Sequence, residues 1–440
     1  MKKHIISFIA IIAALCGLCA CTEDGVPAAW ELSKDYERTA SAEDTYNYYD
    51  GAVEPPSAYN NYAQLITNFE LKLFRMHYAA AAERNETEGF MMSPVGTALN
   101  LSLLTNGAAK GTAQDLQLAL GLGLDDEMLN QCSSYFKSRL LAVNSVGLGK
   151  TDELSGKKAE GDPNVFLTLD NVYMIDDETD VRTPFLTLNA NYYGADIFRF
   201  PFGDDSAFEK LSARYDCALD SGSVEPNTLR LFSRLRLGDY WLGGYSAENI
   251  KKGDFTGSDG KTGKAVYLCS EESYVHTDAA QGVLKYTMKN PLKLLYIMPK
   301  DEEIDSYIAH FDSVELSALL DSVNITEKIP VQLPETVCKN TTDGVCLDPA
   351  VKSCGLSSLY TDKANFSSMA HTEGLRLNDV CDYSGCLSLT ASGITTGTPI
   401  SQSVPSAETD KDVLTLDHPF MIAVLDNESN IPICICVKNC

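Results

Sequence analysis

The chain has 440 residues, of which 44% are hydrophobic and 9% aromatic, so it can bury a sizeable core in one large domain or two small ones. That composition excludes a disordered protein. The formal net charge of -26 argues against nucleic-acid binding, which needs clustered Lys and Arg, and solubility is the simpler explanation for the charge.

The N-terminus has the pattern of a secretory signal. Two lysines and a histidine precede an apolar run over 5–18, and small residues follow before Cys21. The run is too short to span a bilayer comfortably. Its ending, Leu-Cys-Ala-Cys, resembles a bacterial lipobox, in which Cys21 would carry the lipid. We therefore expect a lipoprotein-type signal peptide over 1–20, with an ordinary signal peptide as the alternative.

This signal predicts an extracytoplasmic protein, either a lipoprotein of the cell surface or periplasm, held by a lipid on Cys21, or a secreted protein. Residues 21–59 are acidic, lack long periodicity and approach their end with Pro55-Pro56. They indicate a flexible tether that holds a single domain off a membrane.

The domain is predicted to begin with a helix near residue 60. Leu65, Phe69, Leu73 and Met76 recur at helical spacing. Next, Phe-Met-Met-Ser-Pro predicts a short strand that runs into a buried helix, because proline suits the first helical turn. Further strands are expected over 166–174, 197–202, 228–241, 292–299 and 331–334, with a helix over 183–193.

The last part of the chain has a different character. Residues 387–420 become small and polar for about the length of a long strand plus a loop. A loop of that size within a compact domain is most often functional. From Asp417 the sequence predicts two apolar strands joined by a polar turn over 426–430.

Five motifs in the correct order resemble the serpin family. They are FMMSP at 90–94, NGAAKGT at 106–112, NYYGAD at 191–196, LYTDKANFS at 359–367 and DHPF at 417–420. The resemblance covers about residues 61–440. It implies an α+β fold over 60–440, with a large central mixed sheet, smaller sheets, about eight or nine helices, and an exposed reactive loop at about 391–412.

The resemblance also implies a function, namely inhibition of a serine protease by a suicide mechanism. The protease cleaves the loop, which then inserts into the central sheet as a new strand. The hinge that would enter first comprises Ala391, Ser392, Gly393, Ile394, Thr395 and Thr396. It is uncharged and rich in Thr, which favours insertion, whereas Pro399 opposes it.

The resemblance also implies a reactive bond, which is located by counting residues from two landmarks of the family. Counting from Gly393 gives Ala407–Glu408, and counting back from Pro419 gives Glu408–Thr409. We favour Ala407–Glu408, because a small residue before the cut suits an elastase-like protease. The alternative bond would suit a Glu-specific protease.

The family's sheet-opening region is altered in this chain. Ser93 matches a family Ser, Gly96 replaces a second Ser, Ser233 takes the place of an Asn, and Cys381 lies near the position of a His. The usual hydrogen-bonded gate is thus incomplete. A disulfide at Cys381 would replace the gate or lock the sheet.

Eleven cysteines lie beyond the signal region, and this odd number leaves at least one thiol free or bonded to another chain. Their spacing does not fit structural zinc, and the histidines show no metal-binding motif, so neither a metal nor a cofactor is expected. Gly149-Lys150-Thr151 lacks the first glycine of a phosphate-binding loop. Asp220-Ser221-Gly222 lacks the flanking glycines and histidine motif of a serine protease.

The sequence therefore predicts a monomeric protease inhibitor and not an enzyme. Pro399 and the incomplete gate favour an alternative, a non-inhibitory serpin-fold binding or structural protein whose loop does not insert. A hydrolase that uses Ser221 is a third, weaker possibility.

Overall fold

A computed structural model describes residues 25–36, 53–121, 123–145, 162–222, 224–324, 326–397, 405, 407–409 and 413–440. The predicted signal peptide, Cys21 and Gly149-Lys150-Thr151 lie outside these residues. Within them the α-helices are α3 (Tyr59–Glu83), α4 (Pro94–Thr105), α5 (Lys110–Ala119), α6 (Asp126–Leu141), α7 (Thr183–Leu188), α8 (Asp205–Tyr215), α9 (Ile304–His310), α10 (Ser313–Asp321) and α11 (Asp348–Val351).

Two sheets organise the fold. The central sheet contains β2 (Phe166–Asp176), β3 (Asp196–Phe200), β4 (Thr228–Asp239), β10 (Thr336–Lys339), β11 (Val345–Cys346), β12 (Arg376–Asp382), β13 (Cys386–Thr390) and β14 (Gly393–Thr395). The C-terminal sheet contains β1 (Met91–Met92), β5 (Ile250–Thr256), β6 (Thr262–His276), β7 (Ala280–Tyr286), β8 (Leu292–Pro299), β9 (Lys328–Pro334), β15 (Ala407–Glu408), β16 (Leu414–Thr415), β17 (Phe420–Asp426) and β18 (Pro432–Lys438). This architecture confirms the predicted α+β fold.

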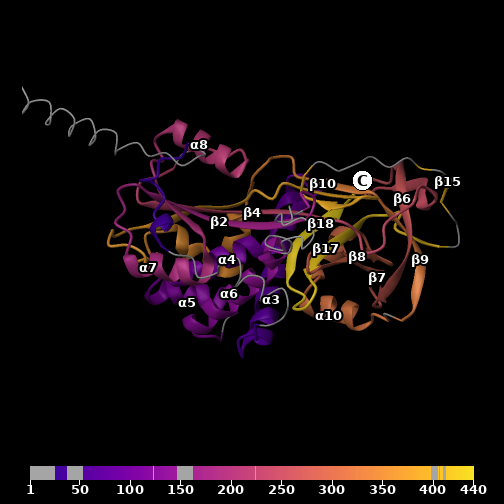
Figure 1. Cartoon of the computed structure of the whole chain (residues 1–440), viewed down its shortest axis with the longest axis horizontal. Helices are drawn as coiled ribbons and strands as arrows, with labels where there is room; N and C mark the ends of the chain where they lie inside the picture. The colour runs from indigo at the N-terminus through magenta and orange to yellow at the C-terminus, as the bar shows by residue number, and fades with distance from the viewer. Residues whose placement is uncertain are drawn as a thin grey trace, which may run out of the picture.

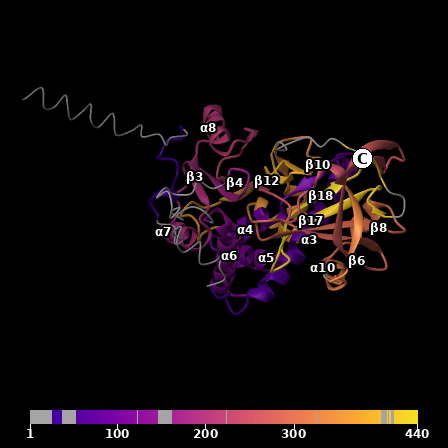
Figure 2. The ribbon, with the colours of Figure 1, turned by 45° about the vertical axis from the view of Figure 1, so that its right-hand side comes forward.

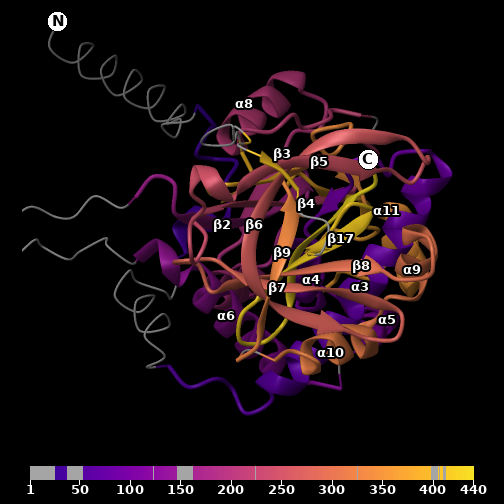
Figure 3. The ribbon, with the colours of Figure 1, turned by 90° about the vertical axis from the view of Figure 1, so that its right-hand side faces the viewer.

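Helices cover both faces of the central sheet. Figure 1 shows α3 to α6 below β2 and β4, and α8 above them, and Figure 2 shows the same arrangement from a second direction. The helix α4 is buried along its whole length, as its small and apolar sequence predicts. Figure 3 looks onto β6 to β9 and β17 of the C-terminal sheet, which lie at the opposite end of the molecule from α7 in Figure 1.

Part of the predicted tether is ordered. Residues 25–36 run beside β3, where the Leu32 amide donates to the Ile197 carbonyl at 2.8 Å. The ring of Trp30 meets Phe200 edge-on with centroids 6.1 Å apart. This segment of the predicted tether over 21–59 therefore packs against the domain, because apolar side chains within its acidic composition find partners on the domain surface.

Candidate functional site

The predicted hinge already forms part of the central sheet. After β13 the chain turns at Ala391-Ser392 and returns as β14, which pairs antiparallel with β13 on one side and with β4 on the other. Ile394 lies opposite Asp239 and is only 1% exposed. The first residues of the loop thus lie between β4 and β13, at the end of β4 that contains Asp239.

Three contacts fix the turn that leads into β14. The Trp241 indole donates to the Thr390 carbonyl at 2.7 Å, and the Ala391 amide donates to the Glu335 carboxylate at 2.9 Å. Gly393 has φ +150°, and a Cβ built there would lie 2.0 Å from the Asp239 carbonyl oxygen. Only glycine allows this close approach to β4.

Thr396 continues the pairing with β4. Its amide donates to the Leu237 carbonyl at 2.9 Å, and its Oγ1 accepts from the Leu237 amide at 3.0 Å. Pro399 and most of the loop that follows lie outside the described residues.

Along the first half of β4, a different strand takes the neighbouring position that β14 occupies near Asp239. The strand β12 runs parallel to β4 as far as Asp382 and Ser233. A break follows before β13 begins, and the Tyr383 amide donates to the Ser233 carbonyl at 2.9 Å across it. Gly385 adopts φ +55° within the break. β12 and β13 are therefore two halves of one interrupted strand.

A buried carboxylate organises this break. Asp382 Oδ2 accepts from the Ser93 amide at 2.7 Å, and its Oδ1 accepts from the Ser384 amide at 3.0 Å and from the Ser384 hydroxyl at 2.5 Å. The Ser384 hydroxyl oxygen in turn accepts from the Leu235 amide at 3.0 Å. Burial raises the pKa of Asp382 to about 6. We call Ser93, Asp382 and Ser384 the latch, because they connect the start of α4 to β4.

The latch lies at the predicted sheet-opening region. Ser93, Gly96 and Ser233 do meet there, since a Cβ at Gly96 would lie 2.4 Å from the Ser233 hydroxyl. Cys381, however, packs in the cluster that includes residues of α8, on the other face of the sheet. Because successive strand residues face opposite sides, Asp382 and not Cys381 points towards α4. The sequence argument did not name Asp382, which is adjacent to Cys381 and makes the contact to Ser93.

Both candidate reactive bonds lie near one short strand. Ala407 and Glu408 form β15, which pairs parallel with Lys251 and Lys252 at the edge of β5. Ala407 is exposed. The Thr409 amide donates to the Lys252 carbonyl at 3.0 Å, which fixes the chain directly after the predicted cleavage site.

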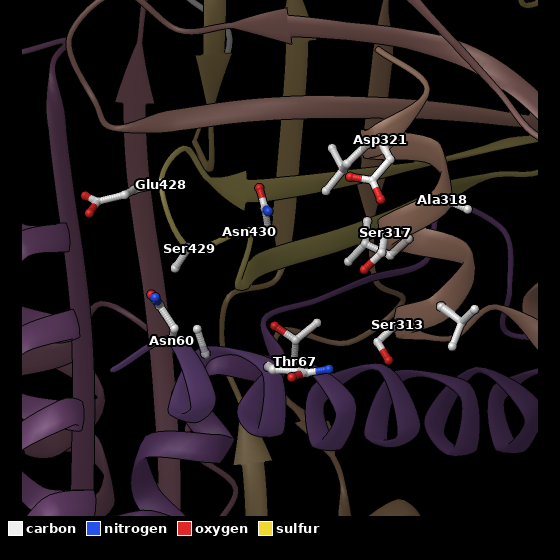
Figure 4. Close-up of a pocket in the computed structure, with 14 residues that line it drawn as sticks. Asn60, Thr67, Ser313, Ser317, Ala318, Asp321, Glu428, Ser429 and Asn430 are labelled. Atoms are coloured by element: carbon white, nitrogen blue, oxygen red, sulfur yellow. The ribbon is translucent and has the colours of Figure 1, made fainter. Parts of the chain in front are cut away.

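A separate cavity of about 680 Å³ lies between α3, α10 and the turn that joins β17 to β18 (Figure 4). Thr67 of α3, Ser317 of α10 and Asn430 of the turn contribute polar groups to its lining. The Asn430 side-chain oxygen is buried without a hydrogen-bond partner.

The cysteines, the metal-ligating residue types and the Asp220-Ser221-Gly222 motif are the remaining candidates for chemistry. All eleven cysteines of the described residues are free thiols, so the structure contains no disulfide among them. Within the same described ranges no group of His, Cys, Asp or Glu has a metal-binding arrangement. Asp220 closes a turn by accepting from the Gly222 amide at 3.0 Å, which gives Asp220-Ser221-Gly222 a structural role.

The described part of the chain has no helix that is both long and apolar enough to cross a membrane.

Comparisons with known proteins agree with this architecture. The serpin (serine protease inhibitor) family model matches residues 64–437. Serpin B5 of Xenopus tropicalis is 21% identical over 79% of this chain and 90% of its own length, and human corticosteroid-binding globulin is 19% identical over 86% and 91%.

Solved structures show the same fold. The thermophilic serpin tengpin in its native state has a TM-score of 0.70 at 21% identity, covering 88% of this chain and 96% of its own. Human thyroxine-binding globulin complexed with its hormone has a TM-score of 0.68 at 17% identity, covering 87% and 98%. With a family match over most of its length, this chain belongs to the serpin family.

Proposed function

We propose that this protein inhibits a serine protease as a suicide substrate and is not itself an enzyme. The protease attacks Ala407–Glu408, and the freed loop enters the central sheet beside β4 while the acyl-enzyme persists, as in inhibitory members of the family. The observation that carries the proposal is β14, whose residues already pair with both β4 and β13. The loop therefore has a strand to extend.

The register of β14 accommodates the proline that opposed insertion. Continued beyond Thr395, which pairs with Ser388, residue 399 of the inserted strand would stand opposite Ser384. The amide of Thr396 points to β4, so the N–H that Pro399 lacks would point away from β4, towards Ser384. The Ser384 carbonyl already accepts from the Cys386 amide at 2.7 Å. Pro399 would thus face the break between β12 and β13, where its missing N–H costs at most one ladder hydrogen bond.

The proposed target is an extracytoplasmic protease with a small specificity pocket. Ala407 before the cut suits an elastase-like enzyme, whereas cleavage after Glu408 would indicate a Glu-specific one. A lipid on Cys21 would hold the inhibitor, as a monomer, at the cell surface or in the periplasm.

The test combines pancreatic-type elastase with the purified protein, followed by a denaturing gel. A complex that survives detergent is expected, and mass spectrometry of the released peptide then identifies the cleaved bond. Ile394 is buried, so residue 398 of an inserted strand would face the same side, whereas Gly397 lies on the other side and is exposed. Thr398→Arg should abolish the complex and give clean cleavage, because a charge would enter the sheet interior. The matched change Gly397→Arg should keep the complex.

A second candidate function is ligand binding without inhibition, and the cavity between α3 and α10 favours it. Relatives are named for binding corticosteroid and thyroxine. The polar lining suits a small molecule with several hydrogen-bonding groups. Clean cleavage by elastase-, trypsin-, chymotrypsin- and Glu-specific enzymes, together with a thermal shift caused by cortisol or thyroxine, would replace the first proposal with this one.

A further inference from the structure

Two cysteines face each other at the edge of the central sheet. β11 and β12 pair antiparallel, with Cys346 directly opposite Cys381. The Leu347 amide donates to the Val380 carbonyl at 2.8 Å, which makes that neighbouring pair the hydrogen-bonded one. Cys346 and Cys381 therefore form a non-hydrogen-bonded pair, in which Cα atoms approach to about 4.5 Å and side chains come closest.

This arrangement satisfies the backbone requirement for a disulfide. Bridged cysteines have Cα atoms roughly 4.4–6.8 Å apart. The neighbouring Cys381 side chain lowers the pKa of the Cys346 thiol. Cys346 is exposed to solvent, whereas Cys381 is partly buried. The more acidic thiol is thus also the accessible one.

We propose that Cys346 and Cys381 are a site of oxidative cross-linking and form a disulfide after export. The Cys346 thiolate attacks the disulfide of a small-molecule or protein donor, forms a mixed disulfide and releases one donor thiolate. Cys381 then loses its proton to solvent, and its thiolate displaces the second donor thiolate from Cys346. Two protein thiols are oxidised and the donor disulfide is reduced to two thiols.

The position of the bridge determines what it can do. It would close a loop that contains α11 and would fix the residue before Asp382. β11 lies on the edge of β12 away from β4, so the bridge does not cross the gap into which the loop would insert. It stabilises the latch side of the sheet without locking the sheet shut, and it therefore does not depend on the proposed inhibitory function.

The other close thiol pair lacks this accessibility. Cys338 and Cys436 also interact, but both are 0% exposed, between β10 and β18. A dissolved donor cannot reach them in the folded protein. Exposure therefore distinguishes the proposed pair.

The experiment incubates the full chain, purified in detergent, with a mixture of oxidised and reduced glutathione. Free thiols are then alkylated and peptides are mapped without reduction. We expect one linked peptide joining Cys346 to Cys381, and unfolding several degrees higher than in the reduced protein. Cys346→Ser should remove both effects, and Cys354→Ser should remove neither. Complete alkylation of Cys346 in the oxidised wild-type chain, or its linkage to a different cysteine, would overturn the proposal even if a variant fails to fold.

Discussion

Replacing Asp382 with Asn should flatten the pH dependence of unfolding between about pH 4 and 7. Burial raises the pKa of this carboxyl group from 3.8 to about 6. About two pKa units correspond to roughly 3 kcal/mol, at about 1.36 kcal/mol per unit. Because the folded pKa is raised, the stabilisation is complete below about pH 4 and is lost as the pH rises through about 6.

The variant also carries a cost that does not change with pH. Its amide group places an N–H donor against the Ser93 amide, where Asp382 offers an acceptor at 2.7 Å. A buried donor without a partner costs about 1–3 kcal/mol. The slope against pH, and not the absolute free energy of unfolding, therefore tests the role of the carboxylate.

The assay is urea unfolding of both proteins at closely spaced pH values. The difference in unfolding free energy, variant minus wild type, should rise by about 3 kcal/mol from about pH 4 to pH 8. The exposed Asp362→Asn provides a matched control and should leave the profile unchanged. Parallel profiles for wild type and Asp382→Asn would refute the assignment of a buried charge to the latch.

Three further changes test the hinge and the core. Gly393→Ala should expel β14, because the new Cβ would lie 2.0 Å from the Asp239 carbonyl oxygen; unchanged hydrogen-exchange protection of the Leu237 amide would contradict this. Ser384→Ala should free the Leu235 amide, so that the loop can pair with β4 one step further along the strand. Hydrogen exchange at the Leu235 amide should be faster until the loop pairs with it, and proteolysis of the loop should be slower. An unaltered cleavage rate would count against this prediction. Glu70→Gln should become more stable relative to wild type as the pH rises, because burial raises the pKa of Glu70 well above its usual value. Chemical unfolding at two pH values measures this difference in unfolding free energy. An equal difference at both pH values would show that the carboxyl group is not buried in solution.

Long local patterns made the frame of the fold predictable. The DHPF motif, its two apolar strands and the polar turn became β17 and β18, which pair antiparallel along their length. The Ser-Pro sequence predicted the start of α4 correctly, since proline occupies its first turn. The formation of such helices, strands and turns is determined by residues close together in the sequence, so it can be predicted from one sequence.

The latch could not be predicted in the same way. Which face a strand residue presents depends on register, and a shift of one residue exchanges the two faces. That shift is the difference between Cys381, which faces Cys346 and the α8 side, and Asp382, which faces Ser93. The packing of residues 25–36 against the domain could not be predicted either, because their partners on β3 are distant in the sequence.

The loop and the latch bond to neighbouring backbone amides of β4, and this determines how far along β4 the loop pairs. Thr396 satisfies both backbone groups of Leu237, and the next donor on the same edge is the Leu235 amide, since alternate residues face that edge. Ser384 already holds this amide, and Asp382 orients the Ser384 hydroxyl. An advancing strand must displace this bond, at about 1 kcal/mol for a neutral hydrogen bond and more for those to the carboxylate. Each residue that follows adds ladder hydrogen bonds and buries side chains. Under the proposed inhibitory mechanism, the latch would govern how far the loop rests and how fast it enters the sheet, while the remainder of the strand would determine whether insertion is completed.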